Sequence, residues 1–249
     1  MSDDLIGLIP AAGKGLRLRL PYPKELYPII RDNRYKPVAQ FVVENMVDSG
    51  IQHIIFVVNE TKHQLIGYFG DGSRFGCNIS YVVQERREEE NGSTSPGLAH
   101  ALNSAYHLTQ GKTVCFGMAD TIMTPGDVFS RMLSKAGKDE TGLLGLFPTD
   151  HPEKFGMVEM GEGERVLCII DKPAKTALQH MWGCIVWRHQ FTEFLHERIA
   201  EDNMADFASI MNAAIQSHLC FRGIYIDGSY TDLGTYEEIM EMEQQSKAE

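Results

Sequence analysis

Basic residues gather in the first forty positions of an otherwise acidic chain. Residues 1–40 contain seven Lys or Arg and four acidic residues, whereas the whole chain of 249 residues has a formal net charge of −11. Three of these cations, Lys14, Arg17 and Lys24, lie in or after the turn Gly13-Lys14-Gly15 that follows an apolar segment. Glycines let backbone N–H groups approach phosphate oxygens, and Lys and Arg neutralise the phosphate charge. The pattern indicates a phosphate-binding loop.

Two familiar phosphate-binding motifs do not fit this loop. A P-loop requires G-x-x-x-x-G-K-[S/T], but Lys14 is followed by Gly15. A dinucleotide-binding fingerprint requires a third glycine, where this chain has Leu18, and an acid after the second strand, where it has Asn59. Taken alone, the glycines could equally serve a tight strand-to-helix turn.

Longer motifs around the loop resemble those of a known family. Residues 9–17 read I-P-A-A-G-K-G-L-R, residues 23–29 read P-K-E-L-Y-P-I, and Lys36-Pro37 follows. These motifs resemble the signature of the sugar-1-phosphate nucleotidylyltransferases, most closely their thymidylyl and uridylyl members. The chain departs from that signature in having Leu16 in place of Thr and a shorter segment between Arg17 and Lys24. The resemblance implies that the nucleotide is bound by Ala11, Ala12, Gly13, Lys14 and Gly15.

The resemblance continues along the chain in the same order. Gln84 and the segment beginning at Gly97 resemble the base-recognition segment, and Met118-Ala119-Asp120 resembles the strand end where the family binds a metal ion. Later motifs are F-G-M-V-E at 155–159, D-K-P at 171–173 and G-S-Y-T-D-L-G-T at 228–235. They imply a second metal ligand at Asp232 and a sugar-phosphate site made by Gly156, Asp171, Lys172 and Tyr230. Asp171 stands where relatives have Glu, and Tyr230 where they have Trp, so the identity of the sugar is open.

The implied reaction joins a nucleoside triphosphate to a sugar 1-phosphate and releases pyrophosphate. Because two polyanions must meet, charge neutralisation and in-line positioning supply most of the catalysis. The resemblance implies that Arg17 binds the β- and γ-phosphates, Lys24 bridges the α-phosphate and the attacking phosphate, and Lys172 holds the sugar phosphate. It also implies that Asp120 and Asp232 bind Mg²⁺, which accepts one or two carboxylates together with phosphate oxygens. The expected protein is a Mg²⁺-dependent nucleotidylyltransferase that favours dTTP or UTP.

Other functions fit parts of the same pattern. A cytidylyl- or guanylyltransferase for another sugar or polyol phosphate would share the motifs. The short segment between Arg17 and Lys24 resembles that of some cytidylyltransferases and of some N-acetylglucosamine-1-phosphate uridylyltransferases. A non-catalytic regulatory relative that binds nucleotide sugars would be expected to lose a cation or a metal ligand, yet all are present. For single residues, Gln84 could be a polar strand terminus, Lys172 a solvated lysine, and each Asp a turn or cap residue.

The elements that would position these residues alternate between short strands and helices. Strands are expected at 5–11, 51–58, 78–83 and 113–117, and helices at 36–49, 62–69 and 97–108. After residue 148 we expect strands at 155–160, 166–171, 181–187 and 221–226, two helices within 190–217 and a last helix at 235–245. This alternation predicts an α/β fold with a Rossmann-like, mostly parallel mixed sheet flanked by helices. A nucleotide-binding half (1–148) and a sugar-phosphate-binding half (149–249) would form one domain, with ligands at the carboxyl ends of the strands.

Composition and charge exclude several other classes of protein. An excess of 34 acidic over 23 basic residues argues against a nucleic-acid or anionic-membrane surface. The longest aliphatic runs are about five residues, too short to span a membrane. The five cysteines have no C-x-x-C spacing, and the acidic N-terminus does not resemble a signal peptide. We therefore expect a cytoplasmic protein with reduced thiols, whose partners are a nucleoside triphosphate and a sugar 1-phosphate.

Two further segments carry expectations. Residues 85–96 are charged and then rich in Gly and Ser, which predicts a loop over the nucleotide that could act as a lid or be a solvated surface excursion. In the last helix, Glu237, Glu238, Glu241 and Glu243 read as a solvated face. Its apolar residues, Tyr236, Ile239, Met240 and Met242, could pack internally or against another subunit of a homo-oligomer.

Overall fold

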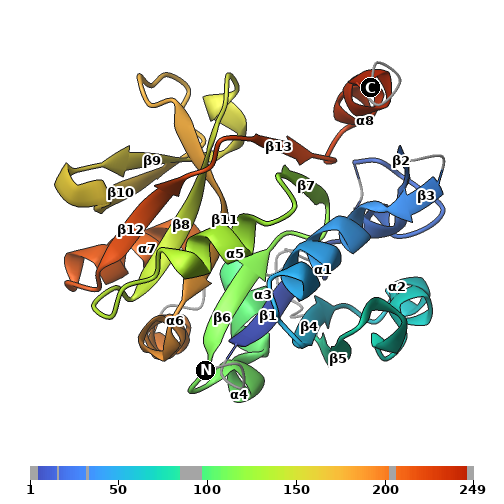
Figure 1. Cartoon of the computed structure of the whole chain (residues 1–249), viewed down its shortest axis with the longest axis horizontal. Coiled ribbons are helices and arrows are strands. Elements are labelled where there is room, and N and C mark those ends of the chain that lie inside the picture. Colours follow the sequence, from blue (N-terminus) through green and yellow to red (C-terminus); the bar gives the residue numbers. More distant parts are fainter. Residues whose placement is uncertain (1–4, 16, 32–33, 85–96, 202–205, 246–249) are drawn as a thin grey trace, which may run out of the picture.

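The computed structural model describes residues 5–15, 17–31, 34–84, 97–201 and 206–245. Within these residues, a nine-stranded mixed sheet forms the centre of the molecule (Figure 1). Four strands of its first half run parallel in the order β5-β4-β1-β6: β1 (Leu5–Pro10), β4 (His53–Val58), β5 (Asn78–Val83) and β6 (Thr113–Gly117). Their carboxyl ends therefore meet at one edge of the sheet.

The second half of the sheet is built around β11 (His180–Trp187). This strand runs antiparallel between β6 and β8 (Gly142–Pro148), and β12 (Phe221–Tyr225) adds to β8 in parallel. The hairpin of β9 (Gly156–Met160) and β10 (Val166–Asp171) pairs with β11 through Met157 and Met181, beyond the carboxyl end of β6. Because β11 belongs to residues 149–249 and pairs along its length with β6 and β8 of residues 1–148, the two halves share one continuous sheet.

Helices cover both faces of the sheet. On one face lie α1 (Val38–Asp48), α2 (His63–Phe69) and α5 (Val128–Ser134); on the other lie α3 (Leu98–Ser104), α4 (Tyr106–Thr109), α6 (His189–Glu201) and α7 (Phe207–Gln216). In β4, Ile54 and Phe56 belong to the first core cluster, whereas Ile55 and Val57 belong to the second. A strand buried on both faces reads as a continuous apolar run, which is the pattern that predicted it.

A group of small elements lies beside the carboxyl ends of the parallel strands. The hairpin β2 (Pro28–Arg31)–β3 (Arg34–Pro37), the pair β7 (Thr121–Thr124)–β13 (Ser229–Asp232) and α8 (Tyr236–Gln245) enclose a third apolar cluster that includes Leu18, Phe41 and Ile239. In Figure 1, β13 crosses from the second half of the molecule to α8, beside the hairpin. Short 3-10 turns complete the chain at Lys24–Leu26 (η2), Ser73–Phe75 (η3), Pro152–Lys154 (η4) and Glu162–Glu164 (η5).

The predicted fold class is confirmed, with local corrections. The strands expected at 78–83, 113–117 and 166–171 have the predicted bounds. The helix expected from residue 36 begins at Val38, because Lys36 and Pro37 pair with Ile29 and Pro28 in the hairpin. The helix expected over 97–108 is interrupted at Ala105, whose φ of −93° and ψ of 8° separate α3 from α4. The strands β2, β3, β7, β8 and β13 and the helix α5 were not predicted.

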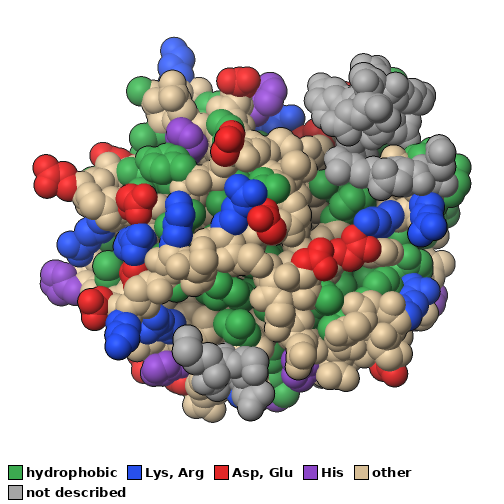
Figure 2. Space-filling view, in the orientation of Figure 1, with side chains coloured by type: hydrophobic (Ala, Val, Ile, Leu, Met, Phe, Trp, Pro, Cys, Tyr) green, Lys and Arg blue, Asp and Glu red, His purple; other side chains and the backbone are tan. Residues whose placement is uncertain are grey.

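The surface charges, the helix lengths and the cysteines bear on the expectations from composition. Lys and Arg side chains are interspersed with Asp and Glu across the face seen in Figure 2. No helix in the described ranges combines the length and apolarity needed to cross a bilayer. All five cysteines are free thiols, and burial raises the pKa of Cys115 to about 12.

Candidate active site

The glycine loop begins where β1 ends. The amide of Ala11 donates to the carbonyl of Val57 (2.7 Å), and Asn59 Nδ2 donates to the carbonyl of Ala12 (2.6 Å). Gly15 has a φ of 62°, a left-handed conformation that strains residues with a side chain. Gly13 and Lys14 are exposed to solvent. The loop is therefore fixed at Ala11 and Ala12 and open to solvent at Gly13 and Lys14. Position 16 lies outside the described residues.

Lys24 reaches from the turn η2 to the end of β6. Its Nζ donates a hydrogen bond to Asp120 Oδ2, and the two side chains form an ion pair. A Cβ placed on Gly15 would lie 3.8 Å from Lys24 Cγ, so the lysine stem passes beside the glycine loop. Burial alone would lower the pKa of Lys24, but the carboxylates of Asp120, Glu25 and Asp232 raise it above its usual value. Lys24 is thus a fixed positive charge.

Asp120 and Asp232 are brought together by the pair β7–β13. Asp232 lies opposite Thr121 in that ladder, and the amide of Leu233 donates to the carbonyl of Asp120 (3.0 Å). Burial, with the nearby carboxylates of Asp120 and Glu238, raises the pKa of Asp232 to about 7. The two predicted metal ligands therefore converge from distant parts of the sequence.

The chemistry of this pair fits Mg²⁺ rather than a metal that needs a full protein cage. Within the described ranges, no three or more His, Cys, Asp or Glu side chains are grouped to hold a metal ion. Two carboxylates suit Mg²⁺, which takes its remaining ligands from water and phosphate oxygens. A divalent cation between Asp120 and Asp232 would also relieve the mutual repulsion that raises the pKa of Asp232.

A cavity of about 670 Å³ opens over these residues. This volume is within the range of small-molecule sites. Nine of the predicted site residues line it: Arg17, Lys24, Gly97, Asp120, Gly156, Asp171, Lys172, Tyr230 and Asp232. The structure does not place the loop residues Ala11–Gly15 or Gln84 among its lining.

Gln84 directly follows β5 and does not line the cavity. Its side chain is buried, and its backbone amide donates to the carbonyl of Val58 (2.8 Å). The loop predicted as a lid, residues 85–96, lies outside the described residues.

The hairpin β9–β10 supplies the predicted sugar-phosphate end of the cavity. Lys172 has a φ of 45°, and its amide donates to the carbonyl of Phe155 (2.9 Å), which turns the chain beside Gly156. Lys172 Nζ lies 3.8 Å from Asp171 Oδ2, and both side chains are exposed. They are free to meet a ligand. A Cβ at Gly156 would lie 2.3 Å from Trp182 Nε1, so glycine is required for the close approach of this wall.

Tyr230 forms another wall of the cavity. Its ring packs against Phe147 and, edge-on, against Phe155, with centroids 5.6 and 5.8 Å apart. Burial raises the pKa of its hydroxyl well above the usual value. Tyr230 therefore serves as a neutral, aromatic surface at this end of the cavity.

Glu238 was predicted as part of a solvated face, and the structure corrects this. Its Oε2 accepts hydrogen bonds from the amides of Gly234 and Thr235 (both 2.9 Å), and its Oε1 accepts one from Lys154 Nζ (2.9 Å). Thr235 Oγ1 accepts in return from the amide of Glu238 (3.3 Å), which completes a capping box at the start of α8. The T-x-x-E spacing at 235–238 could have predicted this cap. The cavity is also lined by residues that were not predicted as site residues, among them Glu153, Lys154, Trp182, Phe207 and Glu238.

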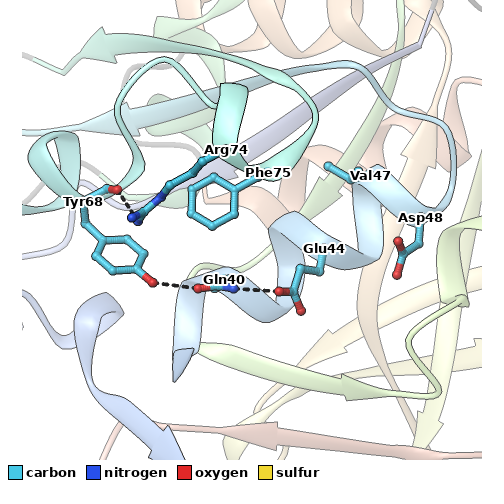
Figure 3. A pocket seen from close by; sticks show the side chains of 7 residues that line it. All are labelled: Gln40, Glu44, Val47, Asp48, Tyr68, Arg74 and Phe75. Carbon is cyan, nitrogen blue, oxygen red and sulfur yellow. Dashed lines mark hydrogen bonds between the residues drawn. The ribbon is translucent and has the colours of Figure 1, made fainter. Parts of the chain in front are cut away.

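A second recess of about 400 Å³ lies between α1 and α2, away from these residues. Figure 3 shows two hydrogen bonds that link three of its polar side chains. Tyr68 Oη donates to Gln40 Oε1 (2.7 Å), and Gln40 Nε2 donates to Glu44 Oε1 (2.6 Å). The Arg74 guanidinium lies 4.2 Å from the Tyr68 ring centroid and 4.6 Å from that of Phe75. These contacts join the two helices, and the recess holds none of the predicted site residues.

Comparison with known proteins identifies the family of this chain. The profile of the nucleotidyl transferase family matches residues 6–249. A low-salt glycan biosynthesis nucleotidyltransferase of Haloferax volcanii is 23% identical over 96% of this chain, and a glucose-1-phosphate thymidylyltransferase of Streptomyces griseus is 27% identical over 94%. This chain spans 65% and 64% of the lengths of those two proteins.

A UDP-glucose pyrophosphorylase crystallised with UDP-glucose has a similar fold. Its TM-score is 0.80 at 20% identity, and the match covers 98% of both chains. The structural match confirms the fold, and the profile over nearly the whole sequence shows the family. The chain belongs to the nucleotidyl transferase family, and the resemblance of its motifs to the sugar-1-phosphate nucleotidyltransferases is confirmed.

Proposed function

We propose that this chain is a Mg²⁺-dependent nucleotidylyltransferase that condenses a nucleoside triphosphate with a sugar 1-phosphate to give a nucleoside diphosphate sugar and pyrophosphate. The observation that carries the proposal is the convergence of Lys24, Asp120 and Asp232 in a cavity also lined by Arg17 and Lys172. These are the residue types needed to bring two phosphorylated molecules together.

The charge of the cavity supports a role for the metal. Four cationic side chains line it, Arg17, Lys24, Lys154 and Lys172, against six carboxylates, Asp120, Glu153, Asp171, Asp206, Asp232 and Glu238. A surplus of carboxylates would repel two polyanionic substrates. Mg²⁺ held by Asp120 and Asp232 would supply positive charge to the α-phosphate and to the oxygens around it.

The chain's own residues would then perform the following steps. An oxygen of the sugar phosphate attacks the α-phosphorus, a new P–O bond forms, and the bond from the α-phosphorus to the oxygen bridging the β-phosphate breaks. Lys24, fixed beside Asp120, would hold the α-phosphate and the attacking phosphate in line. Arg17 would bind the β- and γ-phosphates as they leave, and Lys172 would hold the sugar phosphate. The backbone amides of Ala11–Gly15 would cradle the triphosphate, and Gln84 and Gly97 would contact the nucleobase.

We favour dTTP or UTP as the nucleotide. The names of the relatives support this choice: one is a thymidylyltransferase, and one was crystallised with UDP-glucose. Asp171 and Tyr230 would contact the sugar, and their difference from the usual Glu and Trp leaves the sugar to be determined. The five free thiols are consistent with a reducing compartment, and the cytoplasmic location predicted from the sequence stays a prediction.

A substrate panel tests the proposal. Purified protein is mixed with each of dTTP, UTP, CTP, GTP and ATP, and with glucose, N-acetylglucosamine and mannose 1-phosphates and a polyol phosphate, and pyrophosphate release is measured with and without Mg²⁺. We expect release with dTTP or UTP and one sugar 1-phosphate, abolished by EDTA. Release only with CTP or GTP would move the proposal to those nucleotides. No release from any pair would favour a non-catalytic binding role.

A further inference from the structure

The loop between β4 and α2, residues 59–62, contacts both of the segments proposed to bind phosphate. One end of this β4–α2 loop bonds to the glycine loop through Asn59, and the other bonds to the turn η2 through Lys62. No motif of the sequence analysis includes it. Its side chains do not line the cavity, so its influence on the cavity must be indirect.

Asn59 fixes the glycine loop by a side-chain bond to the backbone. Its Nδ2 donates to the carbonyl of Ala12 (2.6 Å), and its Oδ1 accepts from the amide and the hydroxyl of Thr61 (2.9 and 2.7 Å). Asn59 is 7% exposed, so water competes little with its three hydrogen bonds. The position of Ala12 is therefore set by the conformation of the β4–α2 loop.

Lys62 fixes the turn η2 by an ion pair. Its Nζ donates to both carboxylate oxygens of Glu25, at 2.8 and 2.7 Å, and both side chains are at most 3% exposed. Burial raises the pKa of Glu25, and the charge of Lys62 opposes that effect. A buried carboxylate has few alternative partners, so this bidentate contact fixes the position of Glu25 closely.

The position of Glu25 determines that of Lys24. The two are adjacent in a single turn closed by bonds from the amide of Leu26 to the carbonyl of Pro23 and from the amide of Tyr27 to the carbonyl of Lys24 (both 2.9 Å). A turn of three residues has little rigidity of its own. The Lys24 side chain must nevertheless keep its place beside Asp120, where a displacement of about 1 Å can cost a factor of roughly 10² in rate.

We propose that Asn59 and Lys62 are positioning residues: the β4–α2 loop sets the relative placement of the glycine loop and of Lys24, and so the alignment of the triphosphate with the lysine. This inference rests on the proposed function, because the alignment matters only for that reaction. The two contacts are separable, since Asn59 acts on the segment that would bind the triphosphate and Lys62 on the residue that would act in the transition state.

The first test removes the cation. Lys62→Met should lower kcat roughly 10- to 100-fold while KM for the triphosphate changes less than about threefold, because substrate binding by Arg17 and the glycine loop is retained. The matched control is Arg222→Met in β12, which removes the cation that pairs with the carboxylate of Glu140. Neither Arg222 nor Glu140 lines the cavity. It should lower the thermal midpoint and leave kcat unchanged. Equal loss of kcat in both variants would overturn the proposal.

A paired replacement separates positioning from stability. Glu25→Leu with Lys62→Met removes both charges and restores an apolar contact, which commonly recovers the stability lost in a single variant. We expect the thermal midpoint to recover while kcat stays at least about tenfold below wild type, because an apolar contact does not fix the turn in one orientation. Recovery of kcat together with the midpoint would show that the ion pair has only a structural role.

Asn59→Leu tests the other contact. Loss of the bond to Ala12 should raise KM for the triphosphate about tenfold with kcat within about threefold of wild type. An unchanged KM would overturn this half of the proposal.

Hydrogen–deuterium exchange gives a readout that does not depend on the reaction. In Lys62→Met, the amides of residues 24–27 should exchange at least about fivefold faster, with exchange in β12 unchanged. In Arg222→Met, exchange in β12 should be faster and exchange at residues 24–27 unchanged. If wild type releases no pyrophosphate with any substrate pair, the proposed function fails, and exchange alone decides whether the loop fixes η2. Unchanged exchange at residues 24–27 in Lys62→Met would overturn the inference in either case.

Discussion

The backbone amide of Leu233 donates a 3.0 Å hydrogen bond to the carbonyl oxygen of Asp120. This bond closes the end of the β7–β13 ladder, in which Asp232 lies opposite Thr121. The two carboxylates are therefore held together by backbone pairing, and the pairing itself does not depend on their charges. The pair would therefore be preorganised for the cation that we propose it binds, and preorganisation is the property that electrostatic catalysis requires.

We predict that Asp120→Asn and Asp232→Asn each lower kcat by at least ~10²-fold, as loss of one preorganised electrostatic contact does. Each variant should also need a higher Mg²⁺ concentration for half-maximal rate, measured by titration of pyrophosphate release. The control is Asp48→Asn, an exposed carboxylate in the recess of Figure 3. A near wild-type rate and Mg²⁺ dependence in either site variant would remove that residue from the list of ligands.

Arg17→Ala and Lys172→Ala should affect different substrates. Arg17→Ala is expected to raise KM for the triphosphate about tenfold or more, and Lys172→Ala to raise KM for the sugar phosphate by a similar factor. Initial rates measured with one substrate varied and the other saturating distinguish the two effects. Equal changes for both substrates in both variants would contradict the division of the cavity into two ends.

Gly228→Ala should damage the site from a distance. A Cβ at Gly228 would lie 1.8 Å from the carbonyl oxygen of Thr124, so β13 must move away from β7 and carry Asp232 with it. We expect a lower thermal midpoint and a large loss of kcat. Gly67→Ala in α2 is the control, because its Cβ meets open space and alanine stabilises a helix by up to about 1 kcal/mol. Wild-type activity in Gly228→Ala would show that β13 tolerates displacement.

Asp206 should make α7 sensitive to acid. Its carboxylate accepts from the amide of Ser209 (3.0 Å) and caps the helix. Burial acts to raise the pKa of Asp206, but the hydrogen bonds from Ser209 outweigh it and lower that pKa below the usual 3.8. Because the folded-state pKa is depressed, this stabilisation is present above about pH 4 and is lost as the pH falls through the folded-state value.

Unfolding in urea at two pH values checks this. Asp206→Ala should lower the free energy of unfolding by about 1 kcal/mol at pH 7, the usual value of an N-cap, and by less than half of that near pH 3. Asp127→Ala is the control, since the side chain of Asp127 pairs with the exposed Arg131 and bonds to no amide of α5. An equal loss at both pH values would contradict the capping role of the ionised form.

The sequence allowed the parallel half of the sheet to be predicted, because strands such as β4 are apolar on both faces. The short strands β7 and β13 were missed: each has four residues, and polar side chains interrupt their apolar pattern. The residue types of the metal pair were available from the motifs. That Asp120 and Asp232 meet follows from a pairing between distant segments, which periodicity does not report.

The buried ion pair of Glu25 and Lys62 could not be predicted from the sequence, for a different reason. Both residues have types typical of surfaces, and only the tertiary structure shows that they are buried against each other. Glu238 could have been found, because the T-x-x-E spacing is local. The meeting of Asp120 and Asp232 was predictable only through the family resemblance of their motifs, whereas the contact of Glu25 with Lys62 was not predicted, because Lys62 belongs to no such motif.

The place of β11 between β6 and β8 limits how this molecule can respond to substrates. A hinge between residues 1–148 and 149–249 would have to break the ladders that β11 makes with both neighbours. The two ends of the cavity therefore cannot swing apart as rigid lobes, and any closure over substrates must come from loops at the rim. For the same reason, two fragments cut near residue 148 would each expose unpaired strand edges, and we expect them to regain a cavity only by reassembling with each other.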